Sequence, residues 1–400
     1  TMAACALLGG QPVRTRPFPA WPQSDGRDLG FLQSVLETSQ WGGTIHGPKV
    51  TQFCETWADY CDAKFGIGMT SCTAGLELAL RAFDVGPGDE VIIPSMTFIA
   101  TANAILHAGA TPVFVEVHPR TVNIDPQSVE DAITPRTKAI MPVHQIGMPA
   151  GMAALLDIGA RHGLKIIEDA ACAVGSEVDL GDGWEKVGRP RGDLACFSFH
   201  PRKLITTGEG GMLTCADEAT ATRLRRLRHH GMSVSDRTRH SSGRVVAEEY
   251  VEVAHNYRMT DLQAAMGLGQ MEKLAGIVEA RRRLAARYTE HLAEVEALTP
   301  PFEPAYARSN YQSYCVRLAS DAPCSRDELM QKMLDRGIST RRGIMTIHRE
   351  PAYADMCAHV ELPITERASD ETLLIPLYPQ MTDDEQDAVI RALKDCAGRE

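Results

Sequence analysis

From residue 50 to residue 169 the sequence alternates between short apolar runs and longer stretches with helical spacing. Strands are expected at 65–69, 90–94, 112–116, 139–143 and 165–168, with helices at 50–61, 74–83, 100–108, 128–132 and 152–162. Repeated strand–helix alternation is typical of parallel sheets that carry helices on both faces. The pattern therefore predicts an α/β fold with a mainly parallel, doubly wound central sheet.

The chain of 400 residues is too long for one ordinary core, and we expect three parts. Residues 1–35 are rich in proline and are expected to form an N-terminal arm without a regular helix. Residues 36–275 would form the large domain and residues 276–400 a small α+β domain. A long helical stretch from Met259 to about Leu298, broken near Gly276, is expected to join the two domains.

Composition excludes several classes of protein. The formal net charge of -11 argues against nucleic acid as a partner, and no apolar run is long enough to span a membrane. The apolar start of the sequence is short and lacks the basic residues of a signal peptide. The 11 cysteines are odd in number and contain no Cys-x-x-Cys pair, which predicts a reducing compartment, the cytoplasm. No metal-ligand motif is present, so no metal site is expected.

Polar residues stand where several of the expected strands end. In parallel sheets, ligands bind beyond the carboxyl ends of the strands. Thr73 and Ala74 open a helix directly after a strand, so their backbone N–H groups could bind an anion, although an ordinary helix start would look the same. Asp169 follows the strand 165–168 and could pair with a cation or cap the next helix. Alternation directs its neighbour Glu168 to the opposite face.

Lys203 lies in the stretch that runs from Ser198 to Gly211 and ends in glycines. A glycine-rich backbone permits close approach to a ligand, and a lysine in an apolar or cationic site becomes nucleophilic. We predict that Lys203 holds pyridoxal phosphate as a Schiff base. Such a site also needs an acid at the pyridine nitrogen, a flat side chain on the ring and donors for the phosphate. Asp169, Phe98 and Ser198 are candidates, the last together with Thr73 and Ala74.

Six segments of the sequence together resemble one known family. They are Gly86-Pro87-Gly88-Asp89-Glu90-Val91-Ile92, Thr97-Phe98-Ile99-Ala100-Thr101-Ala102-Asn103-Ala104, Asn123-Ile124-Asp125, Glu168-Asp169-Ala170-Ala171, Ser198-Phe199-His200-Pro201-Arg202-Lys203 and Asn256-Tyr257-Arg258-Met259-Thr260. In this order they are similar to the DegT/DnrJ/EryC1/StrS family of sugar and aminocyclitol aminotransferases, which are pyridoxal-phosphate enzymes of fold type I.

The resemblance implies a role for each matching residue. Lys203 matches the Schiff-base lysine, Asp169 the partner of the pyridinium nitrogen and Phe98 the aromatic side chain on the ring. The phosphate would lie on Thr73, Ala74 and Ser198. Asn256 matches an asparagine that reaches the phosphate of the neighbouring subunit, which implies a homodimer with shared active sites.

The sequence departs from the family pattern at two cysteines. Cys72 stands where the family usually has glycine at the start of the phosphate helix. Cys172 replaces a glutamine or histidine near the ring hydroxyl and is a weaker hydrogen-bond donor. These changes concern the tuning of the cofactor. The retained Lys203 argues against the dehydratase branch of the family, in which histidine replaces this lysine.

The sequence thus predicts an aminotransferase that moves an amino group from L-glutamate or L-glutamine to a keto-sugar or keto-cyclitol, through pyridoxamine phosphate, in aminosugar or aminocyclitol (antibiotic-type) biosynthesis. Candidate contacts to substrate or donor carboxylate are His144, Arg258, Arg341 and His348, each of which could instead be structural. Two alternatives stay open: a cofactor-dependent dehydratase or lyase acting on a deoxysugar, and a catalytically silent, cofactor-binding partner protein.

Overall fold

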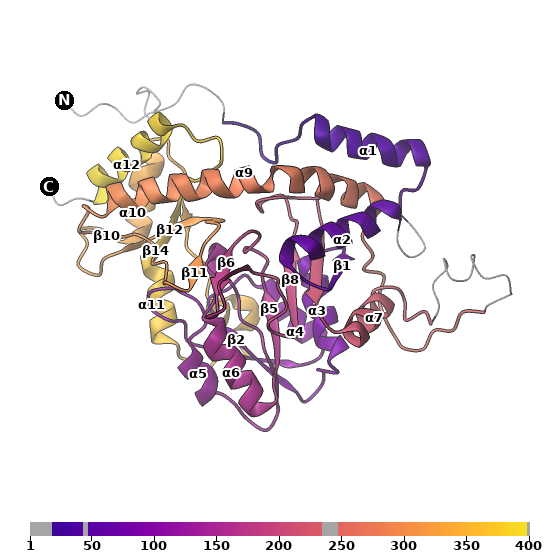
Figure 1. Ribbon diagram of the computed structural model, residues 1–400. Coiled ribbons are helices and arrows are strands. Elements are labelled where there is room, and N and C mark those ends of the chain that lie inside the picture. Colours follow the sequence, from indigo (N-terminus) through magenta and orange to yellow (C-terminus); the bar gives the residue numbers. More distant parts are fainter. Residues whose placement is uncertain (1–17, 43–46, 234–246, 398–400) are drawn as a thin grey trace.

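The computed structural model describes residues 18–42, 47–233 and 247–397. Its centre is a seven-stranded sheet with the order β1-β9-β8-β5-β4-β2-β3 (Figure 1). The neighbours from β8 to β3 pair in parallel, whereas β9 runs antiparallel between β1 and β8. The fold is therefore α/β with a mostly parallel central sheet, as the strand–helix alternation predicted.

The elements of the large sheet and its helices are α1 (Gly26–Thr38), α2 (Pro48–Cys61), β1 (Phe65–Met69), α3 (Cys72–Ala82), β2 (Glu90–Pro94), α4 (Ala100–His107), β3 (Thr111–Val115), α5 (Pro126–Asp131), β4 (Thr137–Ile140), α6 (Met152–His162), β5 (Lys165–Asp169), β8 (Leu194–Ser198), β9 (Gly211–Cys215), α7 (Glu218–Leu227) and α9 (Asp261–Leu292). Two short strands, β6 (Glu177–Asp179) and β7 (Trp184–Lys186), form a hairpin that pairs with β11 (Ala307–Arg308).

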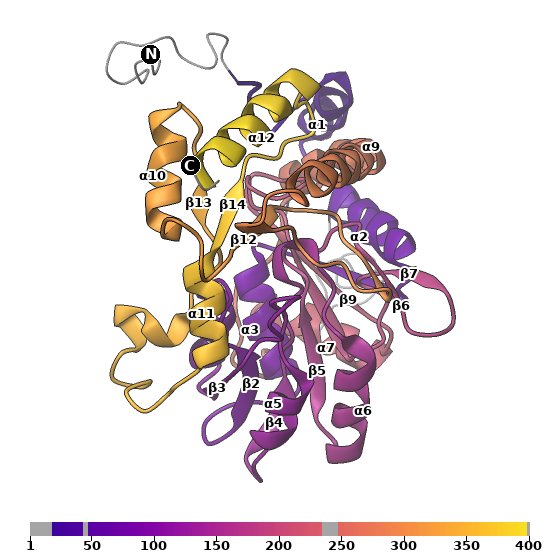
Figure 2. The same ribbon diagram turned by 90° about the vertical axis from the view of Figure 1, so that its left-hand side faces the viewer.

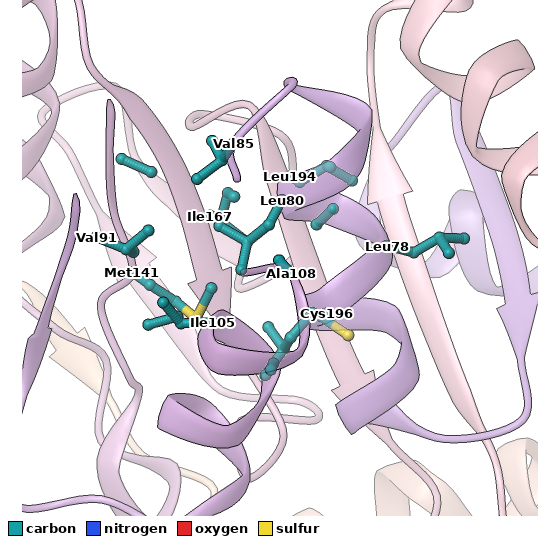
Figure 3. Packing of buried hydrophobic residues seen from close by; sticks show 14 of the residues in the cluster. Leu78, Leu80, Val85, Val91, Ile105, Ala108, Met141, Ile167, Leu194 and Cys196 are labelled. Atoms are coloured by element: carbon teal, nitrogen blue, oxygen red, sulfur yellow. The ribbon is translucent and has the colours of Figure 1, made fainter. Parts of the chain in front are cut away.

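Both faces of the central sheet are buried. In β5 the side chain of Ile167 packs with residues of α3, α4 and α7, while that of the preceding Ile166 packs with α6. Figure 3 shows Ile167 beside Leu80 of α3, within the first of these two cores. Because successive side chains of a strand point to opposite faces, Asp169 is directed to the face of Ile167, toward α4.

The connection from β8 to β9 carries Lys203. Ser198, the last residue of β8, lies opposite Gly211, the first residue of β9. Gly211 also lies against the start of α3, since a Cβ atom added there would stand 2.6 Å from the carbonyl carbon of Ser71 and 2.7 Å from the nitrogen of Cys72. The Lys203 loop and the N-terminus of α3 therefore meet at one edge of the sheet.

The C-terminal part contains a second sheet with the order β10-β12-β14-β13. Its elements are β10 (Leu298–Thr299), β12 (Tyr314–Leu318), α10 (Arg326–Asp335), β13 (Arg341–Arg342), α11 (Pro363–Glu371), β14 (Thr372–Ile375) and α12 (Asp383–Ala397). Figure 2 shows α10 and α12 against this sheet, and their apolar side chains share a core with those of α9. Thr382 and Glu385 exchange the backbone–side-chain bonds of a capping box at the start of α12.

Two expectations about helices were wrong. Part of the N-terminal arm is helical, because α1 begins at Gly26, where Asp25 and Asp28 form a capping box. The long helix α9 is unbroken through Gly276, and it runs from the region of α1 to that of α12 (Figure 1). The boundaries at residues 35 and 275 stay predictions, and residues 1–17 and 398–400 lie outside the described residues.

The continuous α9 can be tested at Gly276. Apart from its chain neighbours and the backbone of its own helix, no atom of the described chain lies within 4 Å of a Cβ atom built on this exposed residue. We expect Gly276→Ala to raise the free energy of unfolding by roughly 0.5–1 kcal/mol, since alanine is the better helix former. Urea denaturation would measure the change. No gain in stability would contradict an unbroken helix at this position.

Candidate active site

The carboxyl group of Asp169 is buried at the end of β5, with the residue 5% exposed. Its Oδ2 accepts a hydrogen bond of 2.8 Å from the hydroxyl of Thr101, on α4, and its Oδ1 accepts one of 3.1 Å from the N–H of Ala171. Burial raises the pKa of Asp169, and both hydrogen bonds and the charge of Lys203 oppose that shift. The group is thus an acid held in place with no cation in direct contact in the described chain.

Lys203 reaches the same region from the loop between β8 and β9. Its Nζ lies 3.0 Å from the sulfur of Cys172, three residues after Asp169. Burial lowers the pKa of Lys203, but Cys172, Asp169 and Cys72 together outweigh it, so the pKa is raised. These interactions show that the structure brings Lys203, Asp169 and both unusual cysteines into one site.

The N-terminus of α3 forms the next wall. The side chain of Ser71 caps this helix by accepting the N–H of Ala74 at 3.1 Å. The N–H groups of Cys72 and Thr73 are the remaining donors of the first turn, where a helix attracts an anion. Ser198 lies nearby, because its partner Gly211 touches the backbone of Ser71. The structure therefore brings Thr73, Ala74 and Ser198 to one corner, where the N–H of Ala74 is bonded to Ser71.

Cys72 fits into the start of α3 through a contact with β8. Its sulfur lies 3.4 Å from the sulfur of Cys196, and Cys196 in turn approaches the carbonyl oxygen of Cys72 at 3.4 Å. Burial and this contact raise the pKa of the Cys72 thiol. Cys72 is therefore a neutral, packed side chain, and α3 begins here with regular geometry.

Phe98 and Asn256 both have exposed side chains. Phe98 is 64% exposed, and its carbonyl oxygen accepts the N–H of Thr101, the residue that contacts Asp169. Asn256 lies on the segment next to β1, where the N–H of Thr70 donates to the carbonyl of Tyr257. Phe98 is thereby close to the acid, whereas Asn256 is placed at the surface beside the start of α3.

The two candidate histidines have structural partners. His144 is completely buried: its Nε2 lies 2.9 Å from Glu168, and its Nδ1 accepts the N–H of Ala150. His348 is 7% exposed, with its ring nitrogens 2.6 Å from the hydroxyl of Ser95 and 3.1 Å from Glu366. Both rings therefore have partners within the protein, and the proposed substrate contacts of these two histidines stay predictions.

The two candidate arginines differ in their surroundings. Arg258 directs its guanidinium to the Nδ1 atom of His229 at 2.6 Å, and its backbone pairs with Met69. Arg341 is exposed on the edge strand β13, opposite Leu374. The role of both arginines toward a substrate stays a prediction.

Several residues that support the site were not identified from the sequence. Thr101 positions Asp169, and the side-chain amide of Asn310 binds the carbonyl oxygen of Cys172 at 2.8 Å. The carbonyls just before Lys203 are also held: Trp21 donates to Pro201 at 2.9 Å and Gln312 donates to Arg202 at 2.8 Å. These contacts join residues far apart in the chain, so only the repeated presence of such polar residues in relatives could have indicated them.

Comparison with known proteins shows to which family this chain belongs. The model of the DegT/DnrJ/EryC1/StrS aminotransferase family matches residues 26–394. The chain belongs to this family. It is 39% identical to the spore coat polysaccharide biosynthesis protein SpsC of Bacillus subtilis, over 91% of this chain and 93% of that protein. It is 38% identical to the GDP-perosamine synthase of Caulobacter vibrioides, over 94% of this chain and 96% of that protein.

Solved structures agree with this assignment. DesV of Streptomyces venezuelae, crystallised with a ketimine intermediate, is 34% identical and superposes with a TM-score of 0.83, covering 93% of this chain and 95% of that one. Another solved relative, 26% identical, is known in a PLP-form and a PMP-form. The protein is thus a pyridoxal-phosphate-dependent aminotransferase of fold type I, from a family that acts on sugars. No helix within the described ranges is long and apolar enough to cross a membrane.

The raised pKa of Asp169 predicts how pH affects the cofactor-free protein. A folded-state pKa above the unfolded value of about 4 means that the unfolded chain binds fewer protons at mildly acidic pH. The contribution of Asp169 to the free energy of unfolding is then fully present below pH ~4. It is lost as the pH rises through the folded-state pKa. We expect Asp169→Asn to remove this fall, as measured by urea denaturation across pH.

A matched control is Asp157→Asn, whose carboxylate is exposed on α6. We expect this variant to keep the wild-type pH profile. If Asp169→Asn also keeps that profile, the carboxyl of Asp169 is not the titrating group.

Proposed function

We propose that this enzyme moves an amino group from L-glutamate or L-glutamine to a keto-sugar or keto-cyclitol, in the biosynthesis of an aminosugar or aminocyclitol natural product. The observation that carries the proposal is the meeting of Lys203, Asp169 and the N-terminus of α3 at one edge of the sheet. Family membership supports the amino transfer and the sugar substrate. Donor and product class are inferred from the resemblance.

The residues fit pyridoxal phosphate by their chemistry. When bound, this cofactor supplies an electron sink for negative charge on the carbon next to the transferred nitrogen. Asp169 would hold a proton on the ring nitrogen, which is the form that withdraws electrons best. Among the described residues no cation contacts the buried carboxyl, and a protonated ring nitrogen would provide one. Thr101 keeps the carboxyl in the orientation needed for that contact.

Lys203 would have two tasks. Its amine would hold the cofactor until the amino donor takes its place. The same amine would then accept a proton from the α-carbon of the donor as a base and return it as an acid. The loop that carries Lys203 is held by Trp21 and Gln312, so the amine stays close to the reacting atoms.

The phosphate would bind at the start of α3, with Thr73, Ser198 and, in place of its bond to Ser71, the N–H of Ala74 as contacts. Phe98 would cover one face of the ring, and Cys172 would lie near the ring hydroxyl. We further propose a homodimer in which the exposed Asn256 reaches the phosphate of the other subunit. The segment around Asn256 carries other exposed apolar side chains, which supports contact with a second subunit; they are Tyr250, Val251 and Val253.

The proposal also includes the residues that would bind the amino donor and the compartment in which the enzyme works. Arg341, exposed on β13, is a candidate for the carboxylate of the donor, and Arg258 is a second candidate. The cysteines of the described chain are free thiols, which supports a reducing compartment, the cytoplasm.

The amino transfer can be tested without knowing the acceptor. The enzyme loaded with pyridoxal phosphate is mixed with L-glutamate or L-glutamine that carries an isotope label on the α-amino nitrogen. We expect one labelled nitrogen per site on protein-bound pyridoxamine phosphate, as measured by mass spectrometry. Addition of a keto-sugar nucleotide should then move the label to the sugar.

Two variants test whether the labelling depends on Lys203 in particular. We expect Lys203→Ala to slow labelling by at least about 100-fold, because the amine is the proton carrier. Lys138→Ala, an exposed residue on β4, should leave labelling unchanged. Absence of label with both donors would exclude them as donors, and equal labelling by both variants would contradict the role of Lys203.

A further inference from the structure

The contact between Lys203 and Cys172 joins an amine to a thiol at 3.0 Å. We propose that Cys172 is an oxidation site whose sulfenic acid condenses with the amine of Lys203 to form a reversible sulfur–nitrogen bond. Such a bond takes away the amine that, under the proposed function, carries the cofactor. The site would therefore respond to hydroperoxides and switch the enzyme off until thiols restore it.

Exposure distinguishes Cys172 from the other cysteines. Among the cysteines that the structure describes, only Cys172 and Cys324 are partly exposed, and the rest are buried. Reactive cysteines occupy partly exposed positions next to basic side chains. Cys172 has the amine of Lys203 beside it, whereas the sulfur of Cys324 faces the carbonyl oxygen of Cys396 at 3.8 Å. Cys172 thus combines access with a cationic neighbour.

The backbone holds both partners in position. Asn310 is completely buried, and its side-chain amide binds the carbonyl oxygens of Cys172 and Val174, each at 2.8 Å. On the other side, the N–H of Lys203 donates to the carbonyl of His200 at 2.9 Å. Gln312 binds the carbonyl oxygen of the residue before Lys203. Only a small side-chain movement is then needed to bring nitrogen and sulfur to bonding distance.

The chemistry balances in two steps. A hydroperoxide oxidises the thiol by two electrons: its O–O bond breaks, a sulfur–oxygen bond forms, and an alcohol or water leaves. The lone pair of the Lys203 nitrogen then attacks the sulfur, so that a sulfur–nitrogen bond forms and the sulfur–oxygen bond breaks. The departing hydroxide takes a proton from the nitrogen and leaves as water.

Occupancy of Lys203 by the cofactor decides when the bond can form. While the amine carries pyridoxal phosphate it cannot attack the sulfur. After the amino donor has reacted, the cofactor is pyridoxamine phosphate and the amine is free. The cross-link would therefore form in the pyridoxamine-loaded enzyme and be prevented in the pyridoxal-loaded enzyme.

The experiment treats the two loaded forms with hydrogen peroxide and maps peptides by mass spectrometry. We expect a cross-link between the peptides of Cys172 and Lys203, lighter by two hydrogens than the sum of the free peptides, in the pyridoxamine form. Dithiothreitol should release both peptides and restore activity. Sulfinic or sulfonic acid at Cys172 with Lys203 free would overturn the proposal.

Controls separate this inference from the proposed function. Cys172→Ser should abolish the cross-link, while Cys324→Ser, at the other partly exposed cysteine, should keep it. A cross-link of equal yield in both loaded forms would support the sulfur–nitrogen bond and contradict the role of Lys203 as cofactor carrier. A cross-link that persists in Cys172→Ser would overturn the assignment to this cysteine.

Discussion

The active site depends on a carboxyl group buried at the end of the strand β5. Burying a carboxyl away from water is unfavourable unless its oxygens are hydrogen bonded. Thr101 and the backbone of Ala171 provide these bonds for Asp169 and fix it relative to α4. Burial raises the pKa of Asp169, and a cationic partner would oppose that shift. The parallel pairing of β5 with β8 then brings this acid to the edge from which the Lys203 loop departs.

That loop is held by contacts from three distant parts of the chain. Trp21 comes from the N-terminal arm, Gln312 from the start of the C-terminal part and Gln263 from the first turn of α9. All three side chains bind backbone carbonyls of the loop, so they constrain its path without occupying the site. The small sheet and the long helix therefore contribute to the site by positioning the loop, in addition to their own packing.

The sequence predicted the parts of the site that local patterns determine. Alternation in β5 correctly directed Asp169 and Glu168 to opposite faces, since Glu168 contacts His144 on the far side. The start of α3 was also predicted to within two residues, because this helix follows the short apolar run 65–69.

The same local patterns could not predict contacts between residues that are far apart in the sequence. The hydrogen bonds of His144 to Glu168 and of His348 to Ser95 could not be predicted, because neither partner is close in sequence. The unbroken α9 was missed at Gly276 because packing of a 32-residue helix overrides the weak helix propensity of one glycine. The same limit applies to Cys172, whose contact with Lys203 appears only when two separate loops meet.

The central claim is that Lys203 is the residue that carries the cofactor. The most direct measurement is hydride reduction of the enzyme loaded with pyridoxal phosphate, which makes the covalent link permanent, followed by peptide mapping. We expect the added mass of the reduced cofactor on the peptide that contains Lys203, with one group per chain. Attachment to another lysine, or recovery of all cofactor in free form, would contradict the assignment of the site.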